Sequence, residues 1–93
     1  MNILEEASRL VHGDRGQDYG HPIEYFTVAA DMWAAILGVP VTAEQFGLCM
    51  CAMKIARQCT RPKIDNLVDL AGYAETVNMV IEERKRRETI LAK

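Results

Sequence analysis

Hydrophobic positions recur every three to four residues along nearly the whole chain, and no stretch alternates with period two for long enough to form a strand. The pattern predicts an all-α protein of about four helices, over residues 3–12, 22–37, 43–59 and from an Asp65 cap to about 91. Typical start and stop residues flank these ranges: Asn2 and Thr42 as N-caps, Pro22 at a first helical position, and Gly13 and Gly38 as terminators.

The last two predicted helices are joined by the short sequence TRPK around Pro62. Such a link is too short for a parallel crossover, so we expect an antiparallel helical hairpin. Apolar spacing predicts that the last helix buries Leu67, Leu70, Ala71, Ala74, Val77 and Ile81. The helix over 43–59 carries apolar residues around much of its circumference, which predicts burial both in the core and against a partner subunit.

Composition and size make a single soluble domain over residues 1–93 the expected organisation, with 49% hydrophobic and 26% charged residues. A domain this small buries only about two thirds of its unfolded surface, so we expect a homo-oligomer. A net charge of −2 argues against nucleic-acid binding. The sequence contains neither an apolar stretch of membrane-spanning length nor a signal-peptide pattern, so we expect a cytoplasmic protein without a membrane partner.

The three cysteines, Cys49, Cys51 and Cys59, lie in one predicted helix. Cys49 and Cys51 would point about 200° apart on it, which excludes a disulfide or a shared metal between them. Their odd number and the usual behaviour of free cysteine predict reduced, mostly buried thiols.

The most chemically loaded stretch is GDRGQDYGHP, residues 13–22, which we expect to be an irregular loop. Its glycines would let backbone amides face an anion at the start of the next helix. Arg15, Tyr19 and His21 offer a bidentate donor, a stacking ring and a titratable donor, as a phosphorylated aromatic ligand requires. The alternative is an ordered connector in which Asp14 and Arg15 make local bonds.

Two further groups should meet near the hairpin turn. Lys54 and Arg57 share one face of their helix, and Asp65 and Asp69 are one turn apart on the next. They could form interhelical salt bridges, bind ligand phosphates and hydroxyls, or, through the aspartates, hold Mg²⁺. Gly72 inside a helix predicts that another backbone or a ligand approaches closely there, beside Tyr73. The candidate ligand-binding residues are therefore Asp14, Arg15, Tyr19, His21, Lys54, Arg57, Asp65, Asn66, Asp69 and Tyr73.

Three motifs together resemble a known family: ILEEA…LV.GDR…DYG.P…F over residues 3–26, K..R at 54–57, and DN..D.AGYA over 65–74. They are similar to a family of small phage and prophage proteins catalogued mainly as a domain of unknown function, over roughly residues 3–77. The resemblance implies a phage origin and the cytoplasm of an infected bacterium, and supplies no established activity.

A more distant resemblance is to MazG-like all-α nucleoside triphosphate pyrophosphohydrolases, which are also small helical oligomers. Those enzymes hold Mg²⁺ with an E-x-x-E and a later E-x-x-D motif. This sequence departs from both spacings and offers Asp65-x-x-x-Asp69 instead.

Three function classes follow from the sequence. The first is an oligomeric protein without a resident cofactor that captures a small nucleotide-derived ligand, such as a messenger of host defence. The second is a MazG-like, Mg²⁺-dependent pyrophosphohydrolase that would use Asp65 and Asp69 as metal ligands. The third is a helical protein-interaction module. Converging acidic side chains would favour the enzyme, and a pocket of arginines and tyrosines would favour the binding protein.

Overall fold

The computed structural model describes residues 1–92 and contains helices and no strand in that range. The elements are α1 (Ile3–Arg9), a π-helical turn η1 (Leu10–Asp14), α2 (Arg15–Tyr19), α3 (Pro22–Leu37), α4 (Ala43–Thr60) and α5 (Ile64–Leu91). Because α1, η1 and α2 continue one another, the chain has four helical segments, as predicted. The all-α class is confirmed.

Most of the expected helix boundaries are confirmed. The Asn2 side chain accepts a hydrogen bond from the Glu5 amide at 3.1 Å, and Thr42 and Gln45 form a reciprocal capping box at the start of α4. Gly38 ends α3 in the left-handed conformation, with φ at 73°. The predicted Asp65 cap is wrong, because α5 begins at Ile64 and Asp65 lies in its first turn, where a carboxylate still suits the helix dipole.

The predicted irregular loop over residues 13–22 is also wrong. Residues up to Tyr19 are helical, and among the described residues positive φ occurs only at Gly20 and Gly38. The helix continues because η1 packs on α5: Val11 is buried, and an added Cβ at Gly72 would lie 3.5 Å from its Cγ2. This packing outweighs the low helix propensity of the glycines. An added Cβ at Gly72 would make only an ordinary van der Waals contact with the Val11 side chain, so the predicted close approach by another backbone or a ligand is wrong for the described residues. The irregular segment is reduced to Gly20 and His21.

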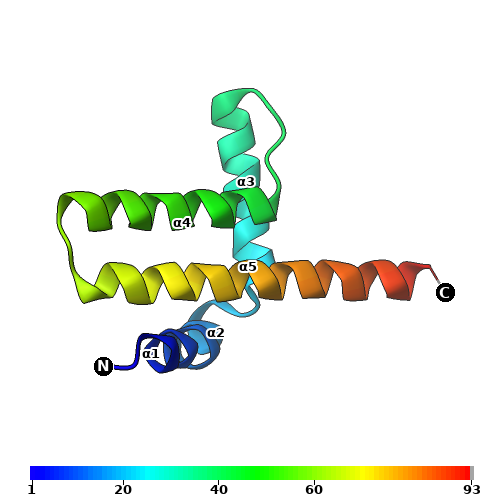
Figure 1. The fold of residues 1–93 in the computed structure, drawn as a ribbon. Coiled ribbons are helices and arrows are strands. Elements are labelled where there is room, and N and C mark those ends of the chain that lie inside the picture. Colours follow the sequence, from blue (N-terminus) through cyan, green and yellow to red (C-terminus); the bar gives the residue numbers. More distant parts are fainter. Residues whose placement is uncertain (93) are drawn as a thin grey trace.

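Helices α4 and α5 form the predicted antiparallel hairpin (Figure 1). Helix α3 crosses this hairpin and contacts both of its helices, and the α1–η1–α2 segment packs against α5. Three contacts define the hairpin register: Gly47 against Val77, Lys54 against Asp69, and Gln58 against Asn66. The first half of α5 is therefore covered both by α4 and by the α1–η1–α2 segment. The C-terminal end of α5 extends past α4.

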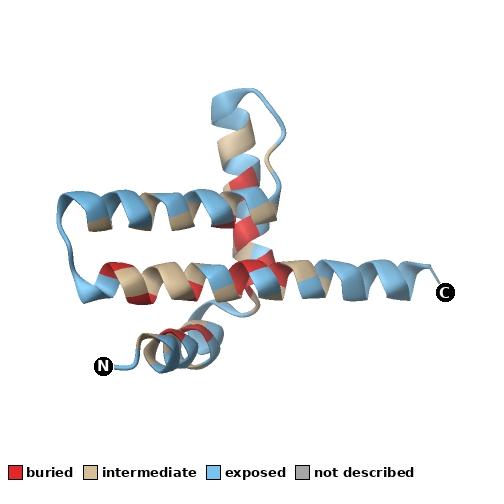
Figure 2. Ribbon diagram, viewed as in Figure 1, coloured by how far each residue is buried: buried red, intermediate tan, exposed pale blue. Residues whose placement is uncertain are grey.

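The core is small and lies where α3 crosses the hairpin (Figure 2). Phe26 and Val80 are its largest fully buried side chains. The predicted buried stripe of α5 is only partly right: Val77 is buried and Ala74 is exposed, while Leu67, Leu70, Ala71 and Ile81 are half-buried. The buried residues of α5 are Asn66, Val68, Gly72, Thr76, Val77 and Val80. Apolar spacing does not mark the small and polar ones among them, Asn66, Gly72 and Thr76.

Helix α4 is more exposed than predicted. Gly47 is its only buried residue, and Leu48 and Ile55 are each more than half exposed. Cys49 and Cys59 are exposed as free thiols and Cys51 is half-buried, so the prediction of mostly buried thiols is wrong for this chain by itself. The physical reason is that α4 contacts its own chain along one face only.

Candidate functional site

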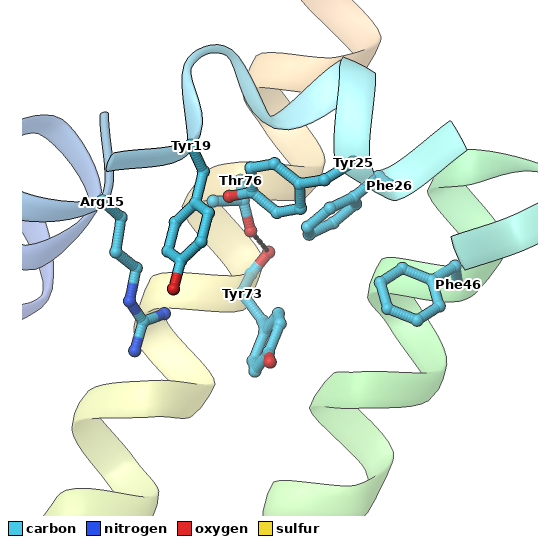
Figure 3. Close-up of a pocket in the computed structure, with 7 residues that line it drawn as sticks. All are labelled: Arg15, Tyr19, Tyr25, Phe26, Phe46, Tyr73 and Thr76. Atoms are coloured by element: carbon cyan, nitrogen blue, oxygen red, sulfur yellow. Dashed lines mark hydrogen bonds between the residues drawn. The ribbon is translucent and has the colours of Figure 1, made fainter. Parts of the chain in front are cut away.

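A pocket of about 420 Å³ lies between α2, α3, α4 and α5 (Figure 3). We call it the tyrosine pocket, and its lining residues are Arg15, Tyr19, Tyr25, Phe26, Phe46, Tyr73 and Thr76. The chain contains three tyrosines and two phenylalanines, and all of them line this pocket. Residues as far apart in sequence as Tyr19 and Tyr73 are thus brought together.

The aromatic rings meet mainly edge to face. The centroids of Tyr19 and Tyr25 are 5.8 Å apart, those of Tyr25 and Phe26 5.2 Å, and those of Phe26 and Tyr73 6.3 Å. Such geometry is the favoured one for neighbouring aromatic side chains. Phe26 is buried, whereas Tyr19 is 66% exposed, so the pocket has an apolar floor and an accessible tyrosine at its rim.

The tyrosine hydroxyls supply polar groups in this apolar setting. Burial raises the pKa of Tyr25 above its usual value, and the positive charge of Arg15 partly opposes that shift. Tyr25 is therefore a neutral hydroxyl at physiological pH, able to donate a hydrogen bond. Thr76 also lines the pocket, but its hydroxyl already donates to the carbonyls of Gly72 and Tyr73, at 3.1 and 2.9 Å.

A charged group adjoins the aromatic rings. The Lys54 ammonium lies 2.9 Å from one oxygen of Asp69, and an Arg15 guanidinium nitrogen lies 3.9 Å from the other. The Lys54 side chain is only 12% exposed, so this ion pair is well shielded. The predicted interhelical salt bridge is confirmed for Lys54 and Asp69. Arg15 is beyond hydrogen-bonding distance of Asp69, so its donors remain available to a ligand at the rim.

Two of the predicted site residues have local structural roles instead. Asp14 accepts a hydrogen bond from Arg9 at 3.2 Å, and His21 caps α3 by accepting from the Ile23 amide at 3.1 Å. Neither residue lines the tyrosine pocket. For these two residues the structure agrees with the alternative interpretation, a connector held by local bonds.

Arg57 and Asn66 lie at the closed end of the hairpin, in a separate hollow of about 240 Å³ with Arg61 and Lys63. The Asn66 amide donates to the Gln58 side chain and to the Arg61 carbonyl, both at 3.2 Å, and so fixes the turn. The ten predicted residues therefore do not form one site. Arg15, Tyr19 and Tyr73 line the tyrosine pocket, and Lys54 and Asp69 adjoin it.

The aspartates do not fit the Mg²⁺ site that a MazG-like hydrolase would need. Asp65 and Asp69 face a hollow beside α1 that Glu6 also lines, and Asp69 is already paired with Lys54. Within residues 1–92, no group of three or more histidines, cysteines or acidic residues could hold a metal ion. We therefore assign no step to a metal.

Sequence reasoning missed Tyr25, Phe26, Phe46 and Thr76 as lining residues. Phe26 is 1% exposed and belongs to the core while forming the pocket floor. Tyr25 and Phe46 belong to helices whose relative placement the sequence does not specify. The available signal was compositional, because the chain has few aromatic residues and nearly all of them are in this site.

Within residues 1–92, no helix is long and apolar enough to cross a membrane.

Comparison with known proteins identifies phage relatives. The chain is 41% identical over 83 residues to the Gene 55 protein of Mycobacterium phage D29, which covers 88% of this chain and 55% of the relative. It is 40% identical over 76 residues to the Gene 55 protein of Mycobacterium phage L5, covering 80% of this chain and 49% of the relative. The chain thus spans about half the length of the curated relatives it matches.

No solved structure shows significant similarity to the chain. The predicted resemblance to a phage family of unknown function is confirmed, and the more distant resemblance to MazG-like enzymes stays a prediction. Since the family match covers residues 2–81, the chain belongs to the family described as "Domain of unknown function (DUF6378)".

Proposed function

We propose that the tyrosine pocket binds a small phosphorylated ligand with a planar ring, of the nucleotide class, and that the protein captures this ligand without converting it. The observation that supports the proposal is the convergence of every tyrosine and phenylalanine of the chain on one pocket, with Arg15 in its wall. An apolar aromatic floor with a few polar groups is the usual composition of a small-molecule site.

The size of the pocket supports a small ligand. About 420 Å³ lies within the range of roughly 300–1,000 Å³ that is typical of small-molecule sites. The net charge of −2 and the isolated position of Arg15 among aromatic residues are unsuited to a nucleic-acid backbone, which requires an extended basic surface.

Each part of the pocket has a distinct role in the proposed complex. The ring of Tyr19 stacks on the planar ring of the ligand, an interaction typically worth about 1–3 kcal/mol per base. Arg15 donates two parallel hydrogen bonds to a phosphate. The half-buried Lys54–Asp69 pair keeps Asp69 neutralised, so that the carboxylate does not repel the phosphate that Arg15 binds.

The proposal is tested by calorimetry with nucleoside mono- and diphosphates, cyclic nucleotides and ADP-ribose. We expect at least one to bind in the micromolar range. Arg15→Lys should then bind about tenfold more weakly, because lysine cannot form the bidentate contact and the site is partly solvated. Arg61→Lys, the same change at the far hairpin turn, is the matched control and should bind like the wild type.

The stacking role has its own pair of variants. Tyr19→Phe keeps the ring and should retain the affinity within about threefold, whereas Tyr19→Ala removes it and should weaken binding about tenfold. Affinities no tighter than millimolar across the panel, or equal affinity for Arg15→Lys and the wild type, would contradict the proposal.

Capture without conversion is tested by recovering the ligand. After prolonged incubation with Mg²⁺ and the protein, we expect the bound nucleotide to be recovered intact by chromatography. Steady release of pyrophosphate from a nucleoside triphosphate, abolished in Asp69→Asn, would instead support the hydrolase alternative.

A further inference from the structure

Helix α3 carries an exposed apolar stripe that nothing else within residues 1–92 covers. The stripe consists of Val28, Met32 and Ile36, which are 58%, 63% and 80% exposed. They are spaced four residues apart and therefore lie along one side of the helix. The C-terminal end of α3 extends past α4, and most of its residues are exposed (Figures 1 and 2). We call these three residues the α3 stripe.

An isolated helix end of this composition is unfavourable in water. Residues 32–37 read MWAAIL, and Glu24 and Asp31 are the only charged residues of α3. A helix that is apolar on all sides is normally buried. Leu37 is also 60% exposed, so the projecting end presents apolar surface on more than one side.

The accessible surface of the whole chain indicates how much is left uncovered. It amounts to 6290 Å², whereas a monomeric protein of 10.5 kDa typically exposes about 5,400 Å². The excess of about 900 Å² is close to the area of about 800 Å² that each partner buries in a standard stable interface. The excess exposed area is therefore about as large as the area that each chain would bury in a dimer interface.

We propose that a second copy of this chain docks on the α3 stripe, with the two α3 helices antiparallel and a two-fold axis near Met32. The stripe is self-complementary in this arrangement, because Val28 and Ile36 are equally spaced on either side of Met32, so that Val28 of each copy meets Ile36 of the other. The helix ends that bear Glu24 then lie on opposite sides of the axis, and the centre of the interface is apolar.

The second copy also completes the tyrosine pocket, a step that rests on the proposed function. A hollow of about 410 Å³ lies between Tyr19, Tyr25 and the first half of the stripe. It shares Tyr19 and Tyr25 with the tyrosine pocket. A copy docked on Val28 and Met32 fills this hollow and covers the outer side of Tyr19, which is 66% exposed in the single chain.

Sedimentation measures the association without any ligand. At micromolar concentration the wild type should have twice the chain mass of 10.5 kDa. Met32→Glu, a change at an exposed position, should be monomeric with an unchanged helical circular dichroism spectrum. Leu4→Glu introduces the same charge at a residue that is 73% exposed on α1, and should remain dimeric. A monomeric wild type, or a Met32→Glu protein that is still dimeric, would overturn the proposal.

Cross-linking tests the axis independently of folding. In a background where Cys49, Cys51 and Cys59 are serine, Met32→Cys should form an intermolecular disulfide on mild oxidation with diamide, and Leu4→Cys should not. Equal cross-linking of both variants would reject this interface. In the original cysteine background, monomeric Met32→Glu should bind a nucleotide identified by calorimetry at least tenfold more weakly. If no nucleotide binds but the dimer forms as described, the proposed function fails and the interface remains.

Discussion

Position 47 admits no side chain larger than a hydrogen atom. A Cβ built there would lie 2.5 Å from Cγ2 of Val77 and 2.9 Å from a ring carbon of Phe26. Gly47 thus sets how closely α4 approaches α5 and α3, and with it the position of Phe46 beside the tyrosine pocket. Apolar patterning could not identify this residue, because a glycine within a helix carries no periodic signal.

Gly47→Ala should therefore destabilise the protein by about 1–3 kcal/mol, the usual cost of overpacking. The expected loss comes in spite of the higher helix propensity of alanine, which by itself would contribute about 1 kcal/mol in the other direction. The loss of stability is measured by urea unfolding. Gly13→Ala is the matched control, because a Cβ there meets no atom within 4 Å, and it should leave stability unchanged or raise it. Equal stability of Gly47→Ala and the wild type would show that the hairpin is not closely packed there.

The residues of the site were only partly predictable. Arg15, Tyr19 and Tyr73 were identified because each combines suitable chemistry with an unusual local sequence. His21 and Asp14 had equally suitable chemistry, but helix capping and a local ion pair use them. A single sequence does not separate these roles, because the same polar atom can bond to its own backbone or to a ligand.

At the scale of the elements, α5 extends past the hairpin as a helix stabilised by charged pairs. Its Glu83 accepts hydrogen bonds from Arg86 and Arg87, and Arg87 also reaches Glu24 of α3 at 2.8 Å. The hydrogen bond from Arg86 is the main reason that the pKa of Glu83 falls to about 2, with Arg87 adding to it.

The lowered pKa of Glu83 predicts how the C-terminal end of α5 responds to acid. Because the folded pKa lies below that of an unfolded glutamate, near 4.5, the pairing stabilises the helix above that pH and is lost as pH falls toward about 2. An NMR titration should find Glu83 still ionised at pH 3.5. Arg86→Gln should raise its pKa toward the usual value, and Arg84→Gln, at a residue that pairs with Glu44 instead, should not. A wild-type pKa near 4.5 would show that the pairs do not persist in solution.

Helix positions were predicted well where caps are strong and poorly where packing decides. The start of α4 follows from its capping box and the end of α3 from Gly38. Residues 13–19 contain two glycines, which predicted a loop, yet burial of Val11 against α5 holds them in a helix. Long-range packing of this kind leaves no local mark in the sequence.

The whole molecule assembles one pocket from four helices, and the sequence does not determine how those helices meet. The hairpin was predictable from its short turn. The crossing of α3 over the hairpin was not, and it is this crossing that carries Tyr25 and Phe26 to Tyr73 (Figure 3). The site that results contains fewer charges and more rings than the sequence suggested, which favours stacking over electrostatics as its main source of affinity.

The central claim, that the tyrosine pocket binds a nucleotide-class ligand, is tested most directly by NMR on protein with labelled aromatic rings. All three tyrosines line the pocket, and Trp33, the only tryptophan, lies in a different hollow. Titration with a nucleotide should shift the ring signals of Tyr19, Tyr25 and Tyr73 together, with one dissociation constant, and leave the Trp33 indole signal in place. Shifts confined to Trp33, or no shift of the tyrosine signals at millimolar nucleotide across the panel, would contradict the account.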